Sequence, residues 1–293
     1  MCPYTVSNLR NQDDFSKKAI YLNERQAPSN HQSNLKDLEV RSITETLFNE
    51  VIKCEEVSHD LKFNLEYAVL CFDAGKVLHQ LNDLNGALTM FNKALVINEK
   101  AFGKLHMSIV VLCSKIGYVL KEMGDYDTSL KMFEKALFIR GNILGKDHSD
   151  NTQSYNIIGL VMHKKGDLDG ALEMHKKALS IIETRHGKNH KSSAVFYNNI
   201  GLLLKEKGDL DGSISMHKIA LVINKTFFGL NNHHTASSYH HIGSVMRQKG
   251  DLEGALQMYK KSLSIREKVL GKDDIKTVNV RKCISRLQAG LVE

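Results

Sequence analysis

The sequence has very little proline: Pro3 and Pro28 are the only two, so residues 29–293 contain none. Proline interrupts helices and fixes many tight turns, and its scarcity leaves this stretch open to a continuous series of helices. Tryptophan is absent, and the five cysteines are odd in number and follow no CxxC spacing. Neither a disulfide framework nor a zinc cluster is indicated, and reduced thiols fit the cytosol.

Long apolar runs are also missing. No run approaches the ~20 residues of a membrane-spanning helix, and the N-terminal residues lack the basic start and apolar stretch of a signal peptide. A content of 42% hydrophobic and 25% charged residues excludes disorder throughout. We therefore expect a soluble, cytoplasmic protein without membrane contact. Its net charge of +7 favours acidic partners without naming one.

Glycine reveals an internal repeat with a period of 42 residues, because 18 of the 20 glycines fall into four series with this spacing. The two complete series are Gly75, Gly117, Gly159, Gly201 and Gly243, and Gly103, Gly145, Gly187, Gly229 and Gly271. The two partial series, with Asn82 and Thr128 in their open slots, are Gly124, Gly166, Gly208 and Gly250, and Gly86, Gly170, Gly212 and Gly254. A fixed period takes precedence over counting domains by length. It predicts five copies over residues 62–271, at about 62–103, 104–145, 146–187, 188–229 and 230–271.

Each copy predicts a helix, a tight turn, a second helix and a loop. The fourth copy shows the i, i+3, i+4, i+7 spacing of a buried helical stripe at Tyr197, Ile200, Gly201 and Leu204. Gly208 then predicts a left-handed helix end, and Asp209 predicts an N-cap for the second helix. Glycine in the middle of the first helix costs about 0.5 to 1 kcal/mol against alanine, so its recurrence there predicts close approach of a neighbouring helix.

The copies share an order of residues: an aromatic or apolar residue, Ile-Gly, Gly-Asp-Leu, Ala or Ser, a ring four residues later and a small residue after three more. This order resembles the tetratricopeptide repeat (TPR). The 42-residue length, and second helices ending in sequences such as ALSIIETRHGKNH (residues 178–190), resemble the repeats of kinesin light chains and nephrocystin-3-like proteins. The resemblance implies an all-α right-handed superhelical solenoid of antiparallel helix pairs, with five full repeats and capping helices.

The ends differ from the repeats. Residues 1–33 predict a loose tail, 34–61 an N-terminal capping helix, and 272–293 a C-terminal capping helix with Arg281 where the copies have Tyr or Cys. Kinesin light chains carry a long heptad coiled coil before their repeats, and the residues preceding the repeats here are too few to supply one. A kinesin or cytoskeletal link therefore rests on the resemblance alone.

No motif for nucleophilic, phosphate-binding or metal chemistry is present, and the repeat occupies most of the chain, so we expect no enzymatic activity and no cofactor. His233, His234, His240 and His241 crowd one region, but no carboxylate or thiol lies at a matching spacing, and we expect no metal there. His175 and His217 hold the ring position that Phe91 and Phe133 hold in other copies, so we expect neutral, partly buried core histidines.

Peptide binding is the favoured function. A rotation of about 100° from the core stripe leads to a second line on the first helix of each copy, and the resemblance implies that this line faces the concave channel. Asparagine amides there can hold a peptide backbone, while Lys and Arg attract carboxylates. The candidate peptide-binding residues are Ser114, Lys115, Tyr118, Lys121, Asn156, Leu160, His163, Lys164, Asn198, Asn199, Leu202, Lys205, His240, His241, Ser244 and Arg247.

The sequence thus predicts a protein-protein interaction scaffold or adaptor whose channel binds a short acidic segment. Two alternatives stay open. A nucleic-acid-binding solenoid would suit the net charge of +7, but it needs stacking platforms, and Tyr155, Tyr197 and Tyr239 fall in the core stripe. A fragment of a larger repeat array is the other alternative.

Overall fold

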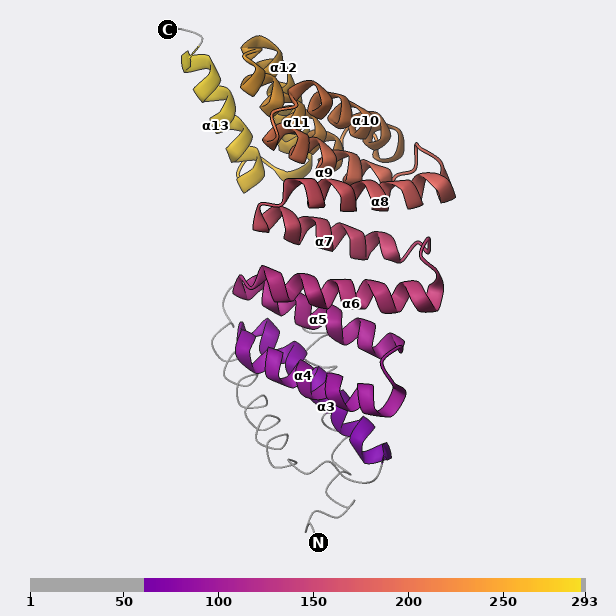
Figure 1. Cartoon of the computed structure of the whole chain (residues 1–293). Helices are drawn as coiled ribbons and strands as arrows, with labels where there is room; N and C mark the ends of the chain where they lie inside the picture. Colours follow the sequence, from indigo (N-terminus) through magenta and orange to yellow (C-terminus); the bar gives the residue numbers. More distant parts are fainter. Residues whose placement is uncertain (1–60, 291–293) are drawn as a thin grey trace. The chain divides into compact units, whose positions relative to one another are not determined.

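The computed structural model describes residues 61–290, and within that range every regular element is an α-helix (Figure 1). The tail predicted at 1–33 and the capping helix predicted at 34–61 lie outside the described residues, apart from Leu61, which begins α3. The helices are α3 (Leu61–Gln80), α4 (Leu84–Phe102), α5 (Met107–Met123), α6 (Tyr126–Leu144), α7 (Asn151–Lys165), α8 (Leu168–His186), α9 (Ser193–Glu206), α10 (Leu210–Phe228), α11 (His233–Lys249), α12 (Leu252–Leu270) and α13 (Ile275–Gly290).

The chain forms two compact units, which meet in sequence between Asp125 and Tyr126. In the first unit, α3 packs on α4 and α4 on α5. In the second, each helix from α6 to α13 packs on the next. Odd-numbered helices up to α11 are the first helices of the predicted copies and even-numbered helices the second. The all-α fold of paired helices is confirmed.

The turn between paired helices forms as the sequence predicts. Gly124, Gly166, Gly208 and Gly250 end their helices with φ between +84° and +92°, and Asn82 takes the same place with φ +62°. Among the described residues Asn82 is the only non-glycine with positive φ, and asparagine tolerates that region better than most residues. A capping aspartate follows: Asp209 Oδ1 accepts a hydrogen bond from the Gly212 amide at 2.9 Å. The same contact occurs at Asp83, Asp167 and Asp251.

The mid-helix glycines admit a ring from the paired helix. A Cβ atom built on Gly201 would lie 2.7 Å from the His217 ring, and one on Gly75 would lie 2.7 Å from Phe91. Gly159 is similarly close to His175. Close helix approach is therefore confirmed, and it explains why a residue of low helix propensity is retained. His175 and His217 are 1% and 0% exposed, so they are fully rather than partly buried.

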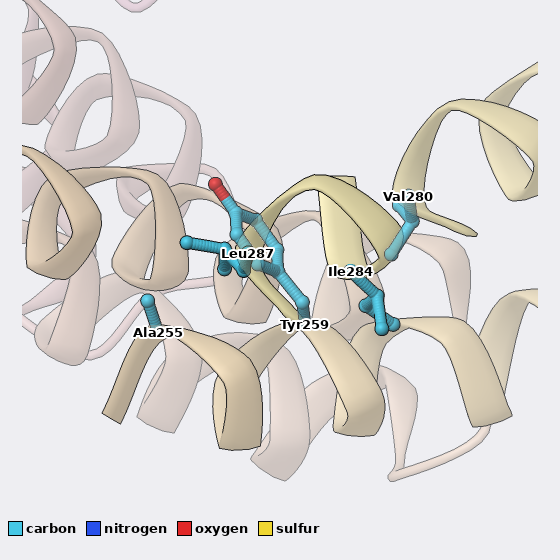
Figure 2. Close-up of a cluster of buried hydrophobic side chains, with 5 residues drawn as sticks. All are labelled: Ala255, Tyr259, Val280, Ile284 and Leu287. Carbon is cyan, nitrogen blue, oxygen red and sulfur yellow. The ribbon is translucent and has the colours of Figure 1, made fainter. Parts of the chain in front are cut away.

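The last helix, α13, packs on α12 through an apolar cluster. Ala255 and Tyr259 of α12 pack against Val280, Ile284 and Leu287 of α13, as Figure 2 shows. The Tyr259 side chain is directed toward Leu287 in this view. On the same helix Arg281 pairs with Glu267 at 2.8 Å. The role of α13 as a cap stays a prediction.

Candidate functional site

The candidate residues on α5 belong to the first unit. Ser114, Lys115, Tyr118 and Lys121 are all half-buried. The Ser114 hydroxyl donates to the Val110 carbonyl at 2.7 Å, and the Lys121 ammonium lies 5.3 Å from the centre of the Tyr118 ring. These four residues present an amphipathic strip with one cation held against an aromatic face.

The other candidates lie on α7, α9 and α11 of the second unit, and hydrogen bonds join these helices directly. Asn199 donates to Asn156 Oδ1 at 3.1 Å, and the Lys205 ammonium donates to Ser244 Oγ at 2.8 Å. The candidate lines of successive first helices therefore adjoin. We call this surface the inner face of the second unit; it consists of Asn156, Leu160 and His163, of Asn198, Asn199, Leu202 and Lys205, and of His240, Ser244 and Arg247.

A carboxylate beside this surface is already engaged. Glu206 of α9 contacts the His163 Nε2 atom at 2.8 Å through one of its oxygens. An equivalent contact in the first unit joins His79 and Glu122 at 2.8 Å. The two histidines, His79 and His163, lie two repeats apart in sequence. In the repeat that follows each of them, the same position is a lysine, Lys121 after His79 and Lys205 after His163.

The amide of Asn198 is held by a buried histidine. Asn198 Oδ1 lies 3.0 Å from His217 Nδ1. Because an amide oxygen only accepts, Nδ1 must carry the proton. Burial, followed by the charges of His241 and Lys205, lowers the pKa of His217 to about 3, so the ring is neutral at pH 7. The Asn198 amide nitrogen keeps its two donors for another partner.

Lys205 and Arg247 supply the positive charge of the inner face. Burial and the neighbouring Arg247 lower the pKa of Lys205, while Glu206 opposes them. Neither cation forms an ion pair within residues 61–290. Glu206 acts on Lys205 through its charge, but its own hydrogen bond is to His163.

The side chains of His240 and His241 differ from those of Lys205 and Arg247 because they carry no charge at pH 7. Burial lowers the pKa of both His240 and His241 to about 4, helped by nearby Arg266 and Lys205. The His241 ring stacks on His217 with centroids 5.1 Å apart, and the centre of the His240 ring lies 5.2 Å from that of Tyr259. Both histidine rings are neutral at pH 7, so they contribute hydrogen-bonding atoms and not charge. On α7, His163 and Asn156 stay on the surface, half-buried, and Leu160 and Lys164 are exposed.

A groove extends the inner face among α7, α8 and α9. Ile181 and Phe196 contribute apolar lining, and Gln153, Asn156 and Val195 line it as well. Of the residues that line this groove, Asn156 alone is among the candidates predicted from the sequence. The residue spacing could have revealed two more of them. Gln153 and Val195 lie three residues before Asn156 and Asn198, and residues three apart share one face of a helix. An apolar side chain could be received here.

Metal and membrane sites receive no support from the described residues. Within residues 61–290, no three His, Cys, Asp or Glu side chains come together as metal ligands, the His233–His241 region included. In the same part of the chain no helix combines the length and the apolar character that crossing a bilayer demands.

Paired antiparallel helices that pack through a glycine and a ring define an α-helical repeat protein. A model of the tetratricopeptide repeat family matches residues 108–184 and 192–268, more than half of the chain, and the protein belongs to that family. The TPR fold is typical of protein-protein interaction scaffolds. No curated protein matches the sequence.

Solved structures show the same fold at low sequence identity. BtubC (BKLC) from P. vanneervenii is 18% identical with a TM-score of 0.62, over 79% of this chain and 91% of that one. A Podosopora anserina protein with nearly identical TPR-like repeats, assigned as a kinesin light chain, is 13% identical with a TM-score of 0.60, over 68% and 94% of the two chains. A variant of that protein is 12% identical with a TM-score of 0.62, over 73% and 99% of the two chains. At these sequence identities the likeness shows a shared fold alone.

Proposed function

We propose that the protein is a non-enzymatic scaffold or adaptor whose inner face binds a short acidic peptide segment. The observation that carries the proposal is a charge imbalance. Lys205 and Arg247 form no ion pair within residues 61–290, whereas the neighbouring carboxylate of Glu206 is occupied by His163. An acidic ligand would gain charge-assisted hydrogen bonds to both cations.

The amides suit the backbone of an extended segment. Asn198 offers its two amide N–H donors, because its oxygen is satisfied by His217. Asn156 accepts from Asn199 and likewise keeps its own amide N–H donors. Lys and Arg further along the same face then select acidic side chains and speed association. The sequence resemblance suggests a finer form of this proposal. In that form the repeats are of the 42-residue kinesin light chain and nephrocystin-3 type, and the protein is a cytoplasmic adaptor.

Nucleic acid is the less favoured ligand. A single-stranded nucleic acid needs aromatic platforms on which bases stack. Tyr197 is buried and donates to Glu183 Oε1 at 2.5 Å, and Tyr155 and Tyr239 are half-buried in the corresponding position. The tyrosines of the first helices in the second unit therefore pack in the core or at its edge.

The test is a binding assay with a display library of short acidic peptides and their charge-neutral counterparts. Peptides selected by the wild-type chain should lose most of their affinity on Asn198→Ala with Lys205→Glu, and their binding should weaken as salt rises. Lys218→Glu makes the same change of charge on the exposed side of α10 and should leave affinity unchanged. Equal losses in both variants, at unchanged helical content, would refute a specific inner-face site.

A further inference from the structure

The loop between α10 and α11 exposes three large apolar side chains. Phe227, Phe228 and Leu230 are 49%, 39% and 58% exposed. The residue that follows the loop glycine is a lysine in the other four repeats, as Lys104, Lys146, Lys188 and Lys272. The fold therefore accepts lysine at the position of Leu230 and does not require an apolar residue there. Contiguous exposed apolar side chains of this kind mark interaction sites.

The loop between α12 and α13 adds a second group of exposed apolar side chains. Val269 and Leu270 end α12 with 42% and 38% exposure, and Ile275, the first residue of α13, is 66% exposed. The position of Ile275 is polar in the three preceding repeats, as Ser149, Lys191 and His233. Two successive loops thus depart from the repeat in the same direction, toward an exposed apolar residue.

Hydrogen bonds place both loops at one edge of the second unit. Asn224 Nδ2 of α10 donates to Ser238 Oγ of α11 at 3.0 Å, and Ser262 Oγ of α12 donates to the Ala236 carbonyl of α11 at 2.8 Å. Short connections make α11 antiparallel to α10 and α12, so from these contacts both neighbours run to their C-terminal ends on the side where α11 begins. We call this surface the loop edge; it consists of Phe227, Phe228, Leu230, Val269, Leu270 and Ile275.

The backbone of the α10–α11 loop forms its hydrogen bonds within the chain. The Gly229 amide donates to the Lys225 carbonyl at 3.1 Å, and Thr235 Oγ1 donates to the Gly229 carbonyl at 2.8 Å. Asn232 Oδ1 accepts from the His234 amide at 2.9 Å. A partner that covers this loop therefore leaves these backbone groups satisfied. A loop that is already held in place also loses little conformational entropy on binding.

Exposed lysines border the loop edge: Lys225, Lys268, Lys272 and Lys276. Residues 225–235 contain no Asp or Glu. In the other loop, Glu267 pairs with Arg281 at 2.8 Å, and Asp274 Oδ1 accepts from the backbone amide of residue 276 at 2.8 Å. An apolar centre with a cationic border is complementary to an apolar segment that is itself bordered by carboxylates.

A protein segment fits the loop edge better than a lipid surface or a second copy of the chain does. Asp273 and Asp274 directly precede Ile275, so anionic headgroups attracted by the lysines would also meet these two carboxylates. A second copy docked through the same surface would bring lysines against lysines, and like charges oppose such a contact. A protein segment avoids both conflicts, because it can place carboxylates opposite the lysines and a donor opposite Asp273.

We infer that the loop edge is a second protein-binding site, which takes a segment whose apolar side chains are bordered by carboxylates. The inner face and the loop edge share no residue. Along α11, Arg247 of the inner face lies 14 residues from His233, where the helix begins, which is roughly 20 Å at a rise of 1.5 Å per residue. The inference does not depend on the ligand of the inner face, and it gives the chain a surface for a second partner.

The test selects ligands for the full chain from a displayed library of amphipathic helical peptides. A stripe of Leu, Ile and Phe is bordered either by Asp and Glu or by Lys and Arg, and the wild type should recover acid-bordered peptides. Leu230→Lys with Ile275→Lys should weaken their binding at least about tenfold, as loss of central apolar anchors does. Lysine holds the first position in the other four repeats and the second as Lys191, so the fold accepts both changes.

Val222→Ser is the matched control. Val222 is 62% exposed on α10, but it lies five residues before Phe227 and so on a different face of the helix. Serine holds its position in both neighbouring repeats, as Ser180 and Ser264. This variant should leave the affinity for the selected peptides unchanged.

A second disruptive variant serves should the first lower helical content. Phe227→Arg with Phe228→His introduces the residues that the third repeat carries at these positions, Arg185 and His186, and it should also weaken binding at least about tenfold. The inner-face variant, Asn198→Ala with Lys205→Glu, should keep the wild-type affinity for the same peptides.

Equal binding by the wild type and both loop-edge variants would overturn the inference, as would recovery of Lys- or Arg-bordered peptides alone. So would a wild-type dimer in sedimentation velocity, or binding to phosphatidylserine vesicles, that Leu230→Lys abolishes, because the occupant would then be a second copy or a membrane. Loop-edge peptides that bind while no acidic peptide binds the inner face would refute the proposed function and keep the second site.

Discussion

His217 donates its Nδ1 proton to Asn198 Oδ1 across 3.0 Å, so a fully buried ring on the second helix fixes an amide on the inner face of the first. His175 holds the equivalent ring position one repeat earlier, yet its Nδ1 atom has no hydrogen-bond partner within residues 61–290. Two histidines at the same position of the repeat therefore differ, because His217 binds a side chain of the inner face through Nδ1 and His175 does not.

This difference predicts different effects of one substitution. His217→Phe should weaken binding of a selected acidic peptide by about fivefold, equivalent to one hydrogen bond of about 1 kcal/mol, because the Asn198 amide is no longer held. His175→Phe should leave affinity unchanged. Phe91 and Phe133 show that the ring position accepts phenylalanine. Fluorescence polarisation with one labelled peptide checks both; equal affinities of the two variants would contradict the orienting role of His217.

The same two histidines predict loss of stability in acid. Burial, helped by neighbouring charges, lowers the pKa of His175 to about 4 and that of His217 to about 3, below the value of about 6.5 expected in the unfolded chain. The unfolded state therefore binds more protons below about pH 6.5, and stability decreases as pH falls from there toward about 4. Each ring should cost about 2 kcal/mol at about pH 5.

Urea unfolding of the wild type and of His175→Phe with His217→Phe checks this pH dependence. The double variant should lose much of the difference between neutral and mildly acidic pH and keep a residual slope from His240 and His241, whose pKa values are also lowered to about 4. A slope equal to that of the wild type would show that the two core rings do not control acid stability.

Two glycine-to-alanine substitutions should have effects of opposite sign. A Cβ at Gly201 would meet His217 at 2.7 Å, so Gly201→Ala should destabilise by about 1–3 kcal/mol through overpacking. At Gly141 of α6 the nearest such atom lies 4.0 Å away, so Gly141→Ala should stabilise by about 0.5–1 kcal/mol through helix propensity. Circular-dichroism melts measure both, and a gain in stability for Gly201→Ala would disprove close ring packing as the reason for a glycine at this position.

Two aspartates at the start of α10 separate capping from surface charge. Asp209→Ala removes the bond to the Gly212 amide and should cost about 1 kcal/mol. Asp211→Ala breaks an exposed ion pair with Lys249 and should cost less than about 0.5 kcal/mol. Both are measured as shifts of the urea midpoint; similar losses would contradict the assignment of Asp209 as the cap.

Much of the fold could be predicted from glycine alone. Left-handed helix ends at Gly166 and Gly208, and rings against Gly159 and Gly201, depend on local geometry that glycine satisfies best, so the sequence records them directly. The partners of the inner face could not be predicted in the same way. The contact of His163 with Glu206 and that of Asn156 with Asn199 depend on how one first helix is displaced along the next.

Arg266 shows a further limit. Its sequence position is equivalent to that of Arg140, and the repeat pattern does not distinguish the arginine that donates to the next helix from the one whose Nε atom is left unsatisfied. The difference comes from the first helix that follows each of them, which carries Ser154 in one copy and Val280 in the other. The partner of the arginine is therefore decided by a residue 14 positions later.

Histidine-glutamate contacts occur at His79 and His163, in the first and third repeats, and the same position holds Lys121, Lys205 and Arg247 in the other three. Backbone geometry repeats every 42 residues, but the side chain at this position is His, Lys, His, Lys and Arg in the five successive repeats. A peptide displaced by one hairpin from Lys205 would meet the His163–Glu206 contact on α7 and α9 in one direction and Arg247 of α11 in the other. Under the proposed function, this difference opposes displacement of a peptide from α9 toward α7 and permits displacement toward α11, where Arg247 keeps the positive charge.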